Sequence, residues 1–353
     1  MIETFIIYNS ILLLSVLFAY YAEHSKTELA RLISRICLFM VLFVPSAIRY
    51  NIGTDYRNYV DYFYSVYGND VKEIGFYVLT VFLRNLHMPA HSLFVCSAIL
   101  TYFPLIFLER KNYTWKMMMY VLSFYLLSYN TVRNSISFSF MILSLDLFFR
   151  DRKWKAFVIY PISILFHVSS FAFLPFFFVN KLRCNRVIFL FFLLIIWGMS
   201  DLDMLFVLLN NDLLLNTKYA GYLFSSHYFG EPTFNTGYSI LLGILHTMFL
   251  FAFFLFSKNK NYTITYLFLL YLVSLVLAKN ILIFSRVADL FKVSLVFVVP
   301  FCLECWHKKR TIILSYLTIL FYVALFEVLI KSNNGNTISG DHGISPYQTI
   351  LNK

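Results

Sequence analysis

Residues 49–59, Arg-Tyr-Asn-Ile-Gly-Thr-Asp-Tyr-Arg-Asn-Tyr, hold the densest group of chemically capable side chains in this sequence. They directly follow an apolar run that ends near Ile48. Arg49 could bind phosphate through its planar guanidinium fork, and Asp55 could accept a proton from a hydroxyl group. The segment could therefore be a membrane anchor, a device of the fold or a substrate site.

Three further ionisable residues, Arg133, His167 and Arg286, stand at breaks between apolar runs. Ionisable groups at membrane depth are costly and are candidates for function, although each alone also fits an interfacial residue. Arginines at positions 49, 133 and 286 would suit a diphosphate and would stabilise its charge without a metal ion. The expected outer loops hold a single Asp-x-Asp pair, Asp201-Leu202-Asp203, and no larger acidic cluster, and we expect no metal and no other cofactor.

The elements that must position these residues follow from composition. The 353 residues are 60% hydrophobic and only 13% charged, whereas soluble domains carry roughly 25% charged residues. A spanning helix needs about 20 apolar residues. The sequence therefore predicts an all-α, polytopic helical bundle that forms a single transmembrane domain over residues 1–353, with about 12 transmembrane segments in a range of 10–12. Apolar runs fall at about 3–20, 32–48, 92–108, 117–131, 135–149, 156–166, 168–180, 187–200, 238–256, 262–279, 287–303 and 311–330.

The basic residues predict the orientation of these segments. Of the 29 Lys and Arg residues, 18 lie in six short loops that connect the runs on one and the same side of the membrane. Such basic loops are cytoplasmic by the positive-inside rule. The net charge of +11 is then a topology signal and not a nucleic-acid surface. The outer connections are expected at about 49–91, 201–237 and 331–353. Any chemistry should lie on that outer side.

Residues 55–67 predict an amphipathic helix in the outer interface. Gly53 permits a tight turn before it, and Thr54 or Asp55 can cap it. Its aromatic side chains fit an aromatic belt at a membrane surface, so anchoring explains part of the segment. The residues at helical spacing are Tyr56, Tyr59, Val60, Phe63 and Tyr67.

These motifs resemble the EpsG-type branch of bacterial polysaccharide polymerases, which includes many Wzy-type O-antigen polymerases. Residues 49–59 are similar to that family's Arg-x-x-x-Gly-x-Asp-Tyr-x-x-Tyr signature after the second span. Residues 73–77, Glu-Ile-Gly-Phe-Tyr, look like its Glu-x-Gly-aromatic element. Weaker landmarks follow in order from there to about residue 350: Arg133-Asn134-Ser135-Ile136 (the family often has Gln where Asn134 stands), Phe166-His167, Ser285-Arg286 and Ser345-Pro346-Tyr347.

The resemblance implies an O-antigen polymerase of the cell inner membrane with its active site facing the periplasm. Such a glycosyltransferase moves a growing glycan from undecaprenyl diphosphate onto a new lipid-linked repeat unit. Its expected partners are the undecaprenyl-diphosphate-linked oligosaccharide and membrane lipids, with a chain-length regulator protein as a further candidate and no nucleic acid.

The same reading assigns roles to individual residues as hypotheses. Arg49, Arg133 and Arg286 would hold the donor diphosphate. The general base on the acceptor hydroxyl would be Asp55 or His167, with Glu73 as the runner-up. Flat aromatic faces that could stack on sugar rings are those of Tyr50, Tyr56, Tyr59 and Tyr347.

Other functions stay open at this point. A flippase would move the same lipid-linked sugar without bond chemistry, but it should show internal symmetry and charges along a central path. A membrane acyltransferase would want a histidine or arginine near the cytoplasmic face. An O-antigen ligase, or a polymerase of capsule or exopolysaccharide, shares so much chemistry that the sequence separates them poorly, and the sugars and linkage stay open.

Overall fold

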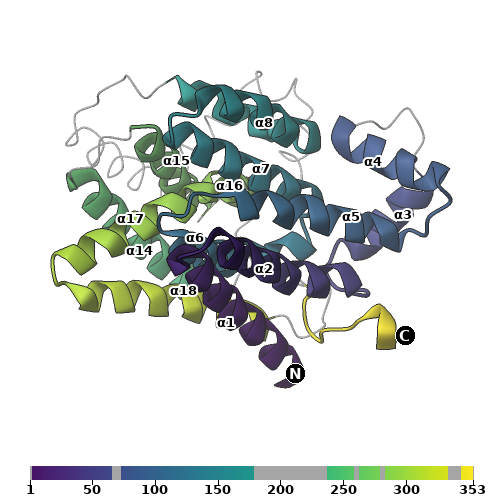
Figure 1. The fold of residues 1–353 in the computed structure, drawn as a ribbon, viewed down its shortest axis with the longest axis horizontal. Coiled ribbons are helices and arrows are strands. Elements are labelled where there is room, and N and C mark those ends of the chain that lie inside the picture. The colour runs from purple at the N-terminus through teal and green to yellow at the C-terminus, as the bar shows by residue number, and fades with distance from the viewer. Residues whose placement is uncertain are drawn as a thin grey trace. The chain divides into compact units, whose positions relative to one another are not determined.

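The computed structural model describes residues 2–65, 73–178, 237–257, 262–278, 283–332 and 343–352, and the described residues contain helices and no strand (Figure 1). The chain divides into two compact units, which we describe separately. Unit 1 comprises Met1–Ala172 and Leu303–Lys353, and unit 2 comprises Phe173–Cys302.

Unit 1 carries most of the helices and ends in a tail. Helix α7 (Val132–Phe149) is apolar around most of its circumference and is therefore buried along most of its length. Helices α1, α2 and α18 instead leave many large apolar side chains exposed, as expected of helices that face lipid. The elements are α1 (Ile2–His24), α2 (Glu28–Ile48), α3 (Tyr56–Ser65), α4 (Ile74–Asn85), α5 (His91–Tyr102), η1 (Phe103–Phe107), α6 (Tyr113–Tyr120), the π-helical η2 (Val121–Tyr125), η3 (Leu127–Tyr129), α7, α8 (Lys153–Phe166) and α18 (Ile312–Ser332).

Unit 2 is built from helices with aromatic contacts between them. Phe173 stacks on Phe291 with ring centroids 5.1 Å apart, and Phe254 meets Phe268 edge-on. The described elements are η4 (Val168–Phe177), which begins in unit 1, then α14 (Gly237–Phe256), α15 (Tyr262–Ala278), α16 (Ile283–Phe291), η6 (Lys292–Ser294) and α17 (Leu295–Lys308), which ends in unit 1.

The all-helical class is confirmed, whereas the number of spans stays a prediction. Among the described residues, four helices are long and apolar enough to cross a membrane: α1, α2, α7 and Ile312–Lys331 within α18. Other predicted runs coincide with shorter apolar helices, and the run at 117–131 is interrupted by η2 and η3. The predicted run 187–200 and outer loop 201–237 lie outside the described residues. The predicted loop 49–91 contains α4, a helix that the sequence reading missed.

At one end of unit 1 the described basic loops pack around carboxylates, of which that of Asp146 is buried. The i,i+4 spacing of Asp146 and Arg150 predicts a structural ion pair, which the structure contains. Asp146, with 2% of its side chain exposed, also binds Lys116 Nζ at 2.7 Å and accepts a hydrogen bond from the backbone N–H of Glu109. Glu23 at the end of α1 accepts hydrogen bonds from the backbone N–H groups of Asn112, just before α6, and of Thr114 in its first turn. Within unit 1, the described segments that are predicted to be cytoplasmic therefore meet at one end.

The Asp146 cluster gives a first prediction about stability. Replacing Asp146 with asparagine should lower the free energy of unfolding by about 3–5 kcal/mol, because the buried Lys116 ammonium and Arg150 lose their common counter-charge. The matched control is Asp151→Asn. The Asp151 side chain is 91% exposed, and its contact with Lys153 Nζ is long, at 3.9 Å. Denaturation of the purified proteins in detergent measures the difference, and equal stability of the two variants would contradict the structural role.

The other end of unit 1 holds both termini (Figure 1). The tail 343–352 is fastened to α1 by Tyr8, whose hydroxyl donates to the Ile344 carbonyl at 2.9 Å. The Tyr347 hydroxyl donates to the Pro45 carbonyl in α2 at 2.7 Å. A bridge pairs Arg49 with Thr349. The segment that follows α2 is therefore held by residues about 300 positions later in the chain.

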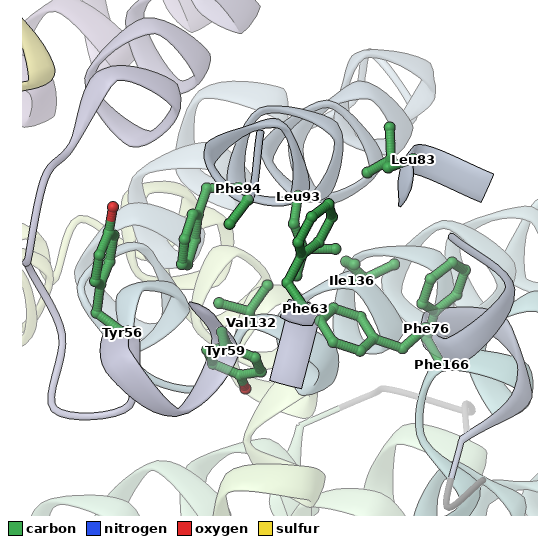
Figure 2. Close-up of a cluster of buried hydrophobic side chains, with 11 residues drawn as sticks. Tyr56, Tyr59, Phe63, Phe76, Leu83, Leu93, Phe94, Val132, Ile136 and Phe166 are labelled. Carbon is green, nitrogen blue, oxygen red and sulfur yellow. The ribbon is translucent and has the colours of Figure 1, made fainter. Parts of the chain in front are cut away.

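Helix α3 is amphipathic as predicted, and its apolar face packs on protein. Tyr56, Tyr59 and Phe63 are each less than 10% exposed and belong to a buried cluster with residues of α4, α5 and α7 (Figure 2). Figure 2 shows the Tyr56 ring parallel to that of Phe94, with centroids 4.4 Å apart. These side chains are thus core residues of unit 1. Anchoring of this helix in a membrane interface stays a prediction, and Tyr67 lies outside the described residues.

Candidate functional site

Three ionisable side chains from separate helices meet at the end of unit 1 opposite the basic loops. Glu73 directly precedes α4, Arg133 lies in the first turn of α7, and His167 directly follows α8. Glu73 Oε1 lies 2.6 Å from His167 Nδ1, and Glu73 Oε2 lies 2.9 Å from Arg133 Nη1. We call this group the Glu73 cluster. It joins three of the residues that the sequence singled out separately.

The two contacts of Glu73 differ in kind. The His167 contact is a hydrogen bond, and because a carboxylate only accepts, Nδ1 carries the proton, which in the neutral imidazole leaves the lone pair on Nε2. The Arg133 contact is close, yet Glu73 Oε2 has no hydrogen-bond partner among the described residues. The N–H bond therefore does not point along the 2.9 Å line, and the contact is an ion pair. Glu73 also benefits from its position at the N-terminus of α4, where a negative charge is favoured.

Exposure separates the inner from the outer members of the cluster. The Glu73 side chain is 10% exposed, whereas 22% of His167 and 36% of Arg133 are exposed. A bound molecule would therefore meet the imidazole and the guanidinium, with the carboxylate behind them. A histidine held by a carboxylate can take a proton at Nε2, and an adjacent guanidinium can stabilise negative charge.

Tyr59 contacts the Arg133 side chain and helps to position it. The Arg133 guanidinium carbon lies 6.0 Å from the Tyr59 ring centroid and 5.8 Å from that of Phe76, within the range of cation–π contacts. A side-chain hydrogen bond also joins Tyr59 and Arg133, and burial raises the pKa of Tyr59 despite the nearby positive charge. Tyr59 is only 8% exposed, so in this structure it positions Arg133 and offers no open face to a sugar.

Gly75 explains how α4 comes near enough to α8 to bring Glu73 to His167. A Cβ atom on Gly75 would lie 3.0 Å from the carbonyl oxygen of Leu165, two residues before His167. Only glycine allows this approach without displacement. The glycine of the Glu-x-Gly-aromatic element thus allows the close helix packing that brings the glutamate of the same element, Glu73, to His167.

Replacing Gly75 with alanine should reduce activity about 10- to 100-fold with a smaller loss of stability. The added methyl group must push α4 from α8 by a few tenths of an ångström, and small misplacements of catalytic groups are costly. The effect is measured on the purified variant by the polymer formation that the family resemblance leads us to expect. Ile74→Ala is the control, because that neighbouring side chain is 60% exposed. Full activity of the Gly75 variant would show that the close approach is not needed.

Arg49 lies inside unit 1, with 2% of the residue exposed. Its guanidinium carbon lies 4.6 Å from the Tyr129 ring centroid and 5.2 Å from that of Phe94. Burial lowers the pKa of Arg49 from its usual value, while the surrounding tyrosines oppose that change. Among the described residues, no carboxylate lies within 4 Å of it. A diphosphate would reach this side chain only if the rings around it moved.

The remaining predicted residues of unit 1 lie as follows. Asp55 precedes α3 and accepts a hydrogen bond from Asn58 at 3.2 Å, and it makes no ion pair with Arg49. Tyr50 meets Tyr56 edge-on at 6.1 Å. The Tyr347 ring is half-buried and meets Tyr8 edge-on at 5.8 Å, so its hydrogen bonds and packing serve the tail.

Arg286 belongs to α16 of unit 2, where it is exposed. On the same helix Asp289 lies 4.0 Å from Lys292. Among the residues that the structure describes, no group of three His, Cys, Asp or Glu side chains could hold a metal ion.

Sequence reasoning missed two residues that hold the segment after α2. Asn130 Oδ1 accepts a hydrogen bond from the Thr54 N–H at 2.8 Å, and the backbone of Tyr129 packs directly against Gly53. Both are buried residues that shortly precede Arg133 in the sequence. This proximity to Arg133 was the only feature of the sequence that could have indicated their role.

Comparison with known proteins gives one match. No curated protein and no solved structure matches the chain. Residues 32–349 match the sequence model of the EpsG family. Because that match covers nearly the whole chain and includes the Glu73 cluster, the protein belongs to the EpsG family, which is in general a family of membrane polysaccharide polymerases.

Proposed function

We propose that this protein is an O-antigen polymerase of the inner membrane that joins undecaprenyl-diphosphate-linked repeat units at the periplasmic face. The observation that carries the proposal is the Glu73 cluster, in which an oriented histidine and an arginine meet at the end opposite the basic loops. The cluster supplies a base and a positive charge. Transfer of a glycan from a diphosphate to a hydroxyl group needs both.

The proposed reaction is a single displacement. A hydroxyl oxygen at the non-reducing end of the new repeat unit attacks the anomeric carbon of the growing glycan. Its proton moves to His167 Nε2, which is available because Glu73 holds the Nδ1 proton. The new glycosidic bond forms while the bond from the anomeric carbon to the diphosphate oxygen breaks. Undecaprenyl diphosphate leaves with the electron pair, and Arg133 stabilises its charge.

This mechanism orders the sequence-based candidates. His167 is the proposed base and Glu73 its positioning residue, in place of an independent base, while Asp55 is the alternative base. Arg133 is the proposed first contact of the diphosphate, and Arg286 of unit 2 is proposed as a second. Arg49, enclosed by aromatic rings, is proposed to act on the fold and not on the donor.

The assignment of Arg133 can be tested by kinetics. Arg133→Lys keeps the charge opposite Glu73 but loses the planar fork, so we expect the KM for the lipid-linked donor to rise about 10-fold, with a smaller change in kcat. Initial rates on purified protein in vesicles measure this. Arg57→Lys, on the exposed face of α3, is the control. An unchanged donor KM would remove Arg133 from the diphosphate site.

Deletion of the gene tests the function as a whole. A polymerase mutant should lose the long-chain ladder of surface polysaccharide and keep a single repeat unit. Loss of every repeat would instead indicate a flippase or a ligase. Loss of capsule or exopolysaccharide with an intact O-antigen ladder would assign the polymerase to that product. The size distribution of the ladder in the parent strain then tests for a chain-length regulator, and the composition of its polysaccharide identifies the sugars.

A further inference from the structure

A small polar cavity lies beside the buried guanidinium of Arg49. Its volume is ≈ 10 Å³, enough for one group the size of a water molecule. Polar side chains from α2, α5 and η3, together with Arg49, provide part of its wall. The polar lining residues are Ser46, Arg49, Ser97, Thr101, Tyr102 and Ser128.

Three hydrogen-bond donors in this wall lack an acceptor. Arg49 Nε and Nη1 are buried and have no hydrogen-bond partner among the described residues, and the same is true of Ser97 Oγ. The other hydroxyl groups are engaged: Thr101 donates to the Ser97 carbonyl at 2.8 Å, and Ser128 donates to the Tyr125 carbonyl at 2.6 Å. Buried donors without acceptors are costly. A bound group that accepts hydrogen bonds would therefore stabilise this cavity.

The charge of Arg49 narrows the identity of that group. A buried guanidinium needs a counter-charge as well as hydrogen bonds. The faces of Tyr129 and Phe94 supply only part of this stabilisation. A water molecule would accept the hydrogen bonds but would carry no charge, and a phosphate group exceeds the space for one water-sized group.

We propose that this cavity binds a single monatomic anion, chloride in the cell, coordinated by Arg49 Nε, Arg49 Nη1 and the Ser97 hydroxyl. The anion neutralises the guanidinium at the point where α2 ends. Since Arg49 also pairs with Thr349 of the tail, the bound anion stabilises the joint between α2, α5 and the tail. It is a structural ion, separate from the Glu73 cluster, and takes no part in glycan transfer.

Thermal unfolding of the purified full-length protein in detergent tests this proposal. Chloride replaces gluconate at constant ionic strength, and the unfolding midpoint is recorded. Because a ligand stabilises the folded state in proportion to the logarithm of its concentration, we expect the midpoint to rise by about 5 °C between roughly 1 and 200 mM chloride. Bromide should act similarly. A midpoint independent of both halides would overturn the proposal in favour of water.

Variants of Ser97 make the test specific. Ser97→Ala removes one donor and should shift the chloride titration to about 10-fold higher concentration. Ser97→Asp places a carboxylate opposite Arg49 and should abolish the chloride response altogether. The control is Ser123→Ala: Ser123 Oγ is equally buried and without a partner, but it does not line the cavity, so its response should equal that of the original protein. An unchanged chloride response in Ser97→Ala would refute the assignment even if Ser97→Asp fails to fold.

Pyrophosphate provides the last comparison. If pyrophosphate raises the midpoint at low concentration through Arg49 and chloride does not, the guanidinium belongs to the donor site and the halide proposal is wrong. If chloride acts and its effect is unchanged by pyrophosphate, the anion site is separate from the donor site, as proposed.

Discussion

Replacement of His167 with alanine is expected to reduce the rate of polymer formation about 10²- to 10⁴-fold, the usual contribution of a general base. The imidazole is the partly exposed member of the Glu73 cluster that can take a proton. Activity is measured with purified protein and lipid-linked repeat units, and in cells by the length of the polysaccharide ladder. A variant that keeps more than about a third of the activity would exclude His167 as the base.

Two further variants separate catalysis from folding. His167→Gln keeps an amide that can donate to Glu73 but cannot take a proton, so it should remain inactive while the protein stays folded. His24→Ala is the matched histidine control, because His24 contacts only Tyr20 at the exposed end of α1 among the described residues. If Glu73 acts through His167, adding Glu73→Gln to His167→Ala should cause little further loss. Independent, additive losses would instead give Glu73 a role of its own.

Replacement of Gly53 with alanine is expected to destabilise unit 1 by at least about 3 kcal/mol, one of the larger effects for a single substitution. Its φ of +102° is a conformation that other residues rarely adopt. A Cβ atom there would lie 2.3 Å from the Tyr129 carbonyl oxygen, which is a backbone atom and cannot rotate away as a flexible side chain could. The Gly53 N–H donates to the Gly343 carbonyl at 3.0 Å, so the tail would be displaced too.

The control for this prediction is Gly243→Ala in α14. A Cβ atom on Gly243 meets nothing within 4 Å, and alanine in a helix is favoured over glycine by roughly 0.5–1 kcal/mol. The two substitutions are chemically identical, and their effects on the free energy of unfolding should have opposite signs in denaturation experiments. If Gly53→Ala left the unfolding midpoint unchanged, the tight packing of the motif against Tyr129 would not contribute to stability.

The family signature now divides into parts with different physical tasks. Gly53 makes the turn, Tyr56 and Tyr59 fill the core, and Arg49 lies behind them in the interior. The chemistry that the sequence led us to expect at Arg49 and Asp55 has its best geometry elsewhere, at the Glu73 cluster. Under the proposed mechanism, this dense polar segment serves the fold, and the reaction takes place at the Glu73 cluster.

Local pattern in the sequence was enough for the helical class, for the apolar helices able to span a membrane, and for the amphipathic character of α3. These properties depend on composition and on spacing over a few residues, which the chain carries at every point. The landmarks Glu73, Arg133 and His167 could also be found one by one, because ionisable groups stand out between apolar runs. Helix α4 was missed because its 12 residues are too few for a span.

Only the tertiary structure decided which landmarks meet. Glu73 and His167 are 94 positions apart, and the tail residue Tyr347 reaches Pro45 across 302 positions. No local pattern encodes such contacts, because they depend on how closely α4 and α8 can pack at Gly75 and on which side chains fill the core around Arg49. The sequence by itself determined a helical membrane protein, whereas packing decided that His167 hydrogen-bonds to Glu73 and that Arg49 is enclosed.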